Sequence, residues 1–140
     1  LFIRMKGNRL KRAFEKSVKT TFLLSFLLFI FLLIFATPLI RFIFGENYLQ
    51  SISMLRMLAL LAIFFPLIEI YTSYIISKGK LEKITKLILF IVILSVALPL
   101  LFVKLFLNQG YNAAVFGLIL GLLASKAVHL GALIWISRKI

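Results

Sequence analysis

The sequence contains no cysteine and no aspartate, and it has one histidine and four glutamates. Without cysteine the chain has no disulfide framework, no thiolate ligand for a metal and no thiol nucleophile. It also lacks paired acids, metal-ligand spacing and a glycine loop that would cradle a phosphate. We therefore expect a protein that is not an enzyme and that holds no metal and no cofactor.

Charged residues are scarce in general. They make up 15% of the chain, whereas 63% of the residues are hydrophobic, and the mean hydropathy is +1.13. Soluble domains are roughly half apolar and about a quarter charged. A soluble fold of this length cannot bury so much apolar surface, so lipid is the expected solvent for the helix exteriors. The predicted fold class is an all-α, polytopic membrane helical bundle.

Four long apolar segments define the predicted spans. They cover residues 20–43, 54–77, 85–103 and 113–137. Residues 20–40 carry no charge, and a helix of that length is about 31 Å long, close to the thickness of the hydrocarbon core. Residues 1–19 precede them as a predicted basic, cytoplasmic, interfacial helix. Pro38 lies near the far end of the first span, where a kink costs little, and Pro66 predicts a bend in the second span.

The basic residues are distributed unevenly along the chain. Lys and Arg total 17 and the net charge is +13, a balance that in a soluble protein would suggest nucleic acid. Thirteen of these residues lie in residues 1–19, 78–86 and 138–139, which four spans place on one side of a membrane. Because positive charge favours the cytoplasmic side, we expect a multi-pass protein of the cytoplasmic membrane with both termini cytoplasmic. Lipid, and no nucleic acid, is the expected partner.

Three ionisable side chains fall inside the predicted spans: Glu69, Lys126 and His129. Each costs about 2.5 to 3.5 kcal/mol at the centre of a membrane helix, so each needs a reason. Their distances from the helix ends place all three within about 5 Å in depth. With Ser73, one turn from Glu69, they are candidates for lining a substrate pathway. Two alternatives stay open: Glu69 pairs with Lys126 to lock two helices together, or its partner lies in further sequence.

Small residues recur every four positions along the last span. They are Ala113, Gly117, Gly121 and Ser125, and they lead to His129. Small side chains let a neighbouring helix approach closely, which is how helices pack where lipid removes the hydrophobic drive. We therefore predict a helix-packing role for Gly117, Gly121 and Ser125.

Several short motifs, in this order and spacing, resemble the C-terminal region of the polysaccharide-biosynthesis flippases. These proteins belong to the multidrug, oligosaccharidyl-lipid and polysaccharide exporter superfamily. The motifs are Pro38-Leu39-Ile40, Phe44-Gly45-Glu46-Asn47-Tyr48, Leu55-Arg56-Met57-Leu58-Ala59, Ser77-Lys78-Gly79-Lys80 and Gln109-Gly110-Tyr111-Asn112-Ala113-Ala114. The motifs lie between residues 38 and 114, and the resemblance as a whole covers nearly the entire chain.

The resemblance implies a transporter built from two helical lobes around a cationic cavity. Such a protein moves a lipid-linked oligosaccharide across the cytoplasmic membrane by alternating access, and this chain would supply the last four helices of the second lobe. It would then need further helices of the same polypeptide, or partner subunits, and we expect it to be part of a longer chain. Two alternatives are a cation-coupled multidrug antiporter of the same superfamily and a non-transporting membrane scaffold subunit that binds its partner through the Gly117 face.

Overall fold

A computed structural model describes residues 8–139, and the elements within that range are all helices, as predicted. Five α-helices are joined by tight turns, two of which contain a short 3-10 helix. The elements are α1 (Asn8–Phe44), η2 (Glu46–Tyr48), α2 (Ser51–Leu58), α3 (Leu61–Ser77), α4 (Leu81–Phe106), η3 (Leu107–Gln109) and α5 (Tyr111–Arg138). Gly45 and Gly110, at two of the turns, have φ angles of 84° and 109°, which glycine adopts without strain.

These elements form four helical segments that are long and apolar enough to cross a membrane. They are α1, α2 with α3, α4 with η3, and α5. Large apolar side chains are exposed on all four, including Leu23 on α1, Phe65 on α3, Ile93 on α4 and Val128 on α5. Soluble monomers rarely expose apolar surface on this scale. The protein is therefore a multi-pass membrane protein.

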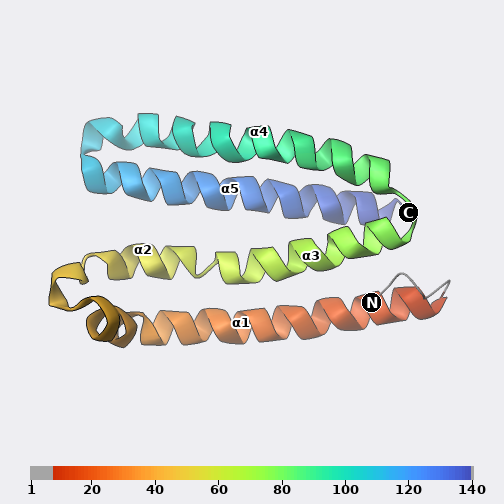
Figure 1. The fold of residues 1–140 in the computed structure, drawn as a ribbon, viewed down its shortest axis with the longest axis horizontal. Coiled ribbons are helices and arrows are strands. Elements are labelled where there is room, and N and C mark those ends of the chain that lie inside the picture. Colours follow the sequence, from red (N-terminus) through yellow and green to blue (C-terminus); the bar gives the residue numbers. More distant parts are fainter. Residues whose placement is uncertain (1–7, 140) are drawn as a thin grey trace.

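The four segments lie side by side and alternate in direction (Figure 1). Their spatial order is α1, α2 with α3, α5 and α4, so α3 and α5 occupy the middle while α1 and α4 form the two edges. The start of α1, the turn between α3 and α4 and the end of α5 share one end of the bundle. The basic segments therefore meet at this end, which we call the basic end.

Helix boundaries differ from the boundaries of the apolar segments. α1 begins at Asn8 and continues without a break past position 20, so the described part of the predicted interfacial helix forms the first turns of the first span. Residues 1–7 of that predicted segment lie outside the described residues. α4 likewise begins at Leu81, where Lys86 Nζ lies 2.7 Å from Glu82 Oε1 in a pair spaced for one helical turn. In both helices the backbone hydrogen bonding of the span therefore continues into the adjoining polar and basic residues.

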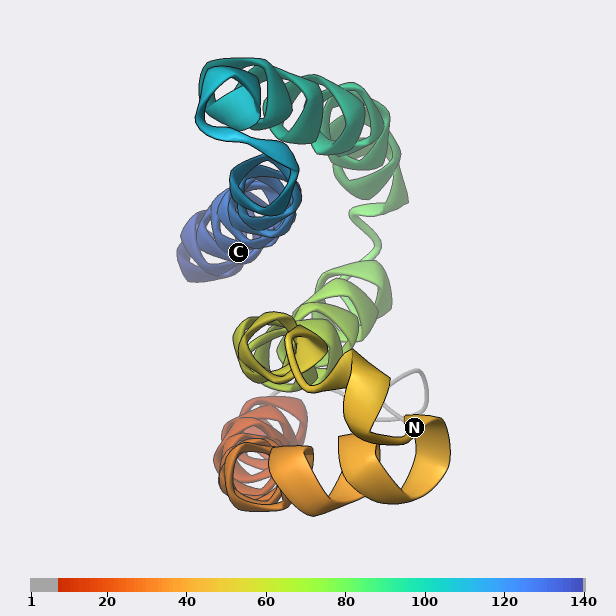
Figure 2. The ribbon, with the colours of Figure 1, turned by 90° about the vertical axis from the view of Figure 1, so that its left-hand side faces the viewer.

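The second span is interrupted between α2 and α3. Around Ala59 and Leu60 the backbone forms hydrogen bonds of the 3-10 type, between residues three positions apart. The amide of Ala62 donates to the carbonyl of Ala59, and that of Ile63 donates to the carbonyl of Leu60, both at 3.0 Å. Pro66 has no amide hydrogen with which to bond the carbonyl of Ala62, and this omission loosens the first turn of α3. The bend predicted from Pro66 is thus present, one to two turns before the proline. α1, which contains Pro38, also changes direction toward its C-terminal end (Figure 2).

α5 packs on α4 through its stripe of small residues. Gly117, Gly121 and Ser125 are buried there. A Cβ atom at Gly117 would lie 2.8 Å from the carbonyl oxygen of Phe102, and one at Gly121 would lie 2.7 Å from the backbone nitrogen of Pro99. Both distances are shorter than real contacts allow, so the two backbones approach this closely only because glycine has no side chain.

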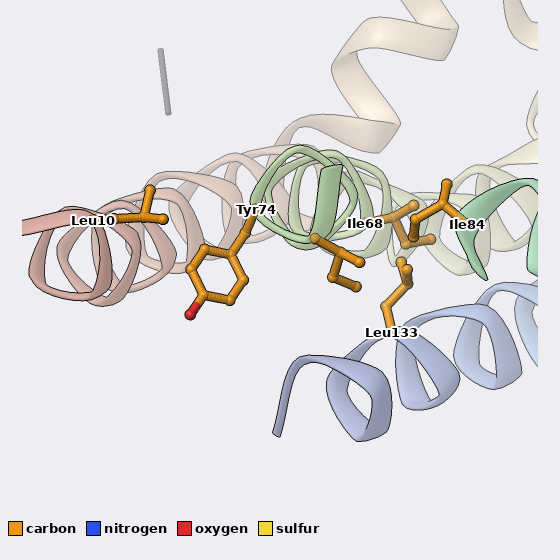
Figure 3. Packing of buried hydrophobic residues seen from close by; sticks show 6 residues of the cluster. Leu10, Ile68, Tyr74, Ile84 and Leu133 are labelled. Carbon is orange, nitrogen blue, oxygen red and sulfur yellow. The ribbon is translucent and has the colours of Figure 1, made fainter. Parts of the chain in front are cut away.

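All four spans meet in one apolar cluster near the basic end (Figure 3). The cluster draws one residue from α1, three from α3 and one each from α4 and α5: Leu10, Ile68, Tyr74, Ile75, Ile84 and Leu133. Ile75 and Leu133 have no exposed surface. This cluster fixes the relative positions of the helices on which the candidate site lies.

Candidate functional site

One face of α3 carries polar groups and is open. Phe65, Glu69 and Ser73 recur at four-residue spacing, so they lie one above another along the helix, and all three are exposed. We call these three residues the open face of α3. The face lies on a helix in the middle of the bundle, where α1 is the neighbour on one side and α5 on the other.

A groove runs between the open face and α1. Its volume is about 560 Å³, and α3 contributes Glu69, Ile70 and Ser73 to its wall. The opposite wall comes from α1 and includes one cation and three hydroxyl groups, those of Lys16, Ser17, Thr20 and Thr21. A carboxylate that faces hydroxyl groups and a cation can bind ions, water or a polar ligand. The groove therefore places a carboxylate, a cation and several hydroxyl groups around one space.

Lys126 approaches the same face from α5. Its Nζ atom lies 5.4 Å from the centroid of the Phe65 ring, in the geometry of a cation–π contact. Phe65 lies one helical turn from Glu69, a distance of about 6 Å along the axis. The structure thus places Lys126 beside Phe65, which lies on the same face of α3 as Glu69 and Ser73.

Glu69 and Lys126 do not form an ion pair. The ion pairs within residues 8–139 join Arg41 to Glu46, at 3.4 Å, and Lys86 to Glu82. In this arrangement no ion pair locks α3 to α5, and both charged groups stay available to a ligand. Lys16, which lines the groove with Glu69, is not paired with it either.

His129 lies one turn from Lys126 on α5. Both of its ring nitrogens are buried, and neither has a hydrogen-bond partner among residues 8–139. Lys126 and Glu69 are near enough to act on the imidazole electrostatically. A buried polar group without a partner costs about 1 to 3 kcal/mol. Ser125, one helical turn before His129, has a hydrogen-bond partner within α5, because its hydroxyl donates to the carbonyl of Leu122 at 2.8 Å.

The α1 wall of the groove was not predicted from the sequence. Lys16, Ser17, Thr20 and Thr21 fall at the junction between the predicted interfacial helix and the first span, where polar residues are unremarkable. Their spacing does carry a signal, because positions 16, 17, 20 and 21 share one face of a helix. That pattern marks a polar face, but it does not identify α3 as the element opposite.

No family model, no curated protein and no solved structure matches this chain. The resemblance of its short motifs to the flippases therefore stays a prediction. Within residues 8–139 there is also no group of three histidine or acidic side chains placed to hold a metal ion. The open face of α3 and its groove are the features from which a function is argued.

Proposed function

We propose that this chain is part of a flippase that moves a lipid-linked oligosaccharide across the cytoplasmic membrane. The observation that carries the proposal is the groove of about 560 Å³ between α1 and α3, which places Glu69 and several hydroxyl groups among apolar helices. Ionisable groups are rare inside membrane spans because their burial is costly. Where they occur, they typically mark a pathway for polar substrates or ions.

The chemistry of such a substrate fits both parts of the site. Sugar hydroxyls form hydrogen bonds with carboxylate and hydroxyl groups, which Glu69, Ser73 and the α1 wall supply. A diphosphate attracts a cation, and Lys126 stands beside the open face with no carboxylate partner in the described part of the chain. The isoprenoid tail needs an apolar surface, which the exposed side chains of the spans offer. Four helices in one row do not surround so large a molecule, so further helices complete the pathway.

The same groove supports a second candidate function, a cation-coupled multidrug antiporter. Glu69 has no ion-pair partner within residues 8–139, and the Thr20 and Ser73 side chains line the groove with it. A carboxylate beside hydroxyl oxygens is a suitable site for H⁺ or Na⁺. Ion-dependent drug efflux that is lost when Glu69 is replaced by glutamine would favour this function over glycan export.

A scaffold that binds a partner through the Gly117 face is not supported. That face is covered by α4 of the same chain, with Gly117 against Phe102 and Gly121 against Pro99. A scaffold would need a different surface.

Cysteine labelling of the groove tests the flippase proposal. The chain contains no native cysteine, so Thr20→Cys and Ser73→Cys can each be introduced alone into the full-length protein. We expect a membrane-impermeant maleimide to label both positions, because water and polar substrate enter the groove. Modification at either position should then reduce glycan export about tenfold, since it fills the pathway.

Ile93→Cys on α4 is the matched control, because its side chain is 70% exposed on an edge helix in the middle of an apolar span. The impermeant reagent should leave it unlabelled and export unchanged. Labelling of Thr20→Cys and Ser73→Cys without any loss of export would contradict the proposal.

A further inference from the structure

A second pocket lies at the basic end and shares no lining residue with the groove. Its volume is about 500 Å³, and it is bordered by α1, by the end of α3 and by α5. Three basic residues line its wall: Lys11 from α1, Lys78 directly after the last residue of α3, and Arg138 from α5. Glu15 is the acidic residue in the lining. The three cations come from distant parts of the chain, so the fold itself brings them together.

The cations of this pocket lack carboxylate partners within residues 8–139, where the ion pairs are Arg41 with Glu46 and Lys86 with Glu82. Like charges gathered around one pocket repel each other, and an anion between them offsets the repulsion. The lining carries more positive than negative charge, which favours a ligand with at least one full negative charge. Lysine and arginine both donate strong hydrogen bonds to phosphate oxygens.

Three aromatic side chains that line the pocket pack against one another. Phe14 stacks on Tyr74, with ring centroids 3.9 Å apart, and meets Tyr71 edge-on at 5.1 Å. Lys78 Nζ lies over the Tyr74 ring, 5.6 Å from its centroid. Figure 3 shows Tyr74 between Leu10 and the rest of the apolar cluster, with its hydroxyl pointing away from Ile68, Ile84 and Leu133. Neither tyrosine hydroxyl forms a hydrogen bond with another residue of the described range.

The position of the pocket indicates where its ligand comes from. Tyrosine rings and basic side chains at the ends of membrane helices mark the depth of lipid headgroups. Basic pockets between helices at this depth bind the phosphates of anionic lipids. We infer that the pocket of Lys11, Lys78 and Arg138 binds a phosphate group, that of an anionic phospholipid headgroup, and so joins α1, α3 and α5 at the basic end. This inference does not depend on the transported substrate.

The experiment measures lipid retained by the full-length protein. Protein from nanodiscs that contain phosphatidylglycerol and phosphatidylcholine is released and weighed by native mass spectrometry. We expect the unmodified protein to retain phosphatidylglycerol selectively, and the double variant Lys78→Gln with Arg138→Gln to retain about tenfold less, because each basic residue contributes to headgroup binding. Lys78→Arg should keep the selectivity.

The matched control is Arg9→Gln with Lys80→Gln. It removes one arginine and one lysine from the same end of the bundle, and neither residue lines this pocket. The control should retain phosphatidylglycerol within about twofold of the unmodified protein. Equal losses in the two double variants would overturn the inference, because they would show attraction by overall charge. The absence of any selectivity in the unmodified protein would overturn it as well. The unfolding temperature in pure phosphatidylcholine verifies that both variants fold.

A second arm distinguishes a lipid phosphate from a soluble one. Phosphatidylglycerol, inorganic phosphate and pyrophosphate are each added separately to the protein in detergent that contains no other lipid, and the rise in unfolding temperature is measured. A rise with phosphatidylglycerol alone assigns the pocket to a headgroup. A rise with pyrophosphate that disappears in the double variant, without selective lipid retention, keeps the phosphate site but overturns the lipid as its source.

Discussion

Replacement of Gly121 by leucine will separate α4 from α5 and destabilise the protein more than any other single change proposed above. A Cβ atom at position 121 would collide with the backbone of Pro99 and lie 2.9 Å from the carbonyl carbon of Leu98. Backbone atoms do not rotate away as a side chain does, so the helices must move apart. Overpacking of a filled interior costs about 1 to 3 kcal/mol for added methylenes, and a leucine at a backbone contact should cost at least about 3 kcal/mol.

Unfolding in mixed detergent micelles, followed by helical circular dichroism, measures this free energy. Gly131→Ala is the control on the same helix, because a Cβ atom there meets nothing within 4 Å. It should leave the unfolding free energy within about 1 kcal/mol of the starting value. Comparable losses from Gly121→Leu and Gly131→Ala would mean that close packing of α4 on α5 does not determine stability.

Glycan export should fall about tenfold or more when Glu69 is replaced by glutamine. The substitution keeps the shape of the side chain but removes the charge that faces the α1 wall of the groove. Hydrogen bonds to a charged group contribute about 1.5 to 3 kcal/mol, and about 1.4 kcal/mol corresponds to a factor of ten. Export is measured in cells that lack their own flippase, at equal amounts of membrane-inserted protein.

Glu82→Gln provides the matched control for the carboxylate. Glu82 is an exposed glutamate in the first turn of α4, paired with Lys86 at the basic end and remote from the groove. Its replacement should leave export unchanged within about twofold, because exposed ion pairs contribute little. If Glu69→Gln and Lys126→Gln both export normally, the open face of α3 is not the pathway.

The number and direction of the spans are predictable from sequence because they depend on local properties. Uninterrupted apolar residues from position 20 onward indicate a helix that crosses hydrocarbon, and glycine at positions 45 and 110 predicts the turns that the structure contains. The continuation of α1 through residues 8–19 is not visible in that signal. Lysine and arginine are good helix formers, so the helix continues through residues that hydropathy assigns to a separate segment.

The contacts between helices are harder to predict because they depend on the tertiary arrangement. The spacing of Gly117 and Gly121 identifies a packing face on α5, but it does not identify Pro99 and Phe102 as the residues opposite. Depth arguments predict that Glu69 lies near Lys126, and in the structure Lys126 contacts Phe65, one helical turn from Glu69. The two groups do not form an ion pair, because Lys126 lies over the Phe65 ring instead. That outcome depends on side-chain directions, which a sequence pattern does not determine.

Site-directed labelling of vesicles from both sides tests the membrane topology most directly. Single cysteines replace Arg9, Asn47, Lys80 and Asn108 in a background without other cysteines, and an impermeant maleimide is added to sealed vesicles of known orientation. Four crossings predict that positions 9 and 80 react only from the cytoplasmic side, and positions 47 and 108 only from the opposite side. Reaction of positions 9 and 80 from opposite sides, or of positions 47 and 80 from the same side, would contradict the four-span arrangement.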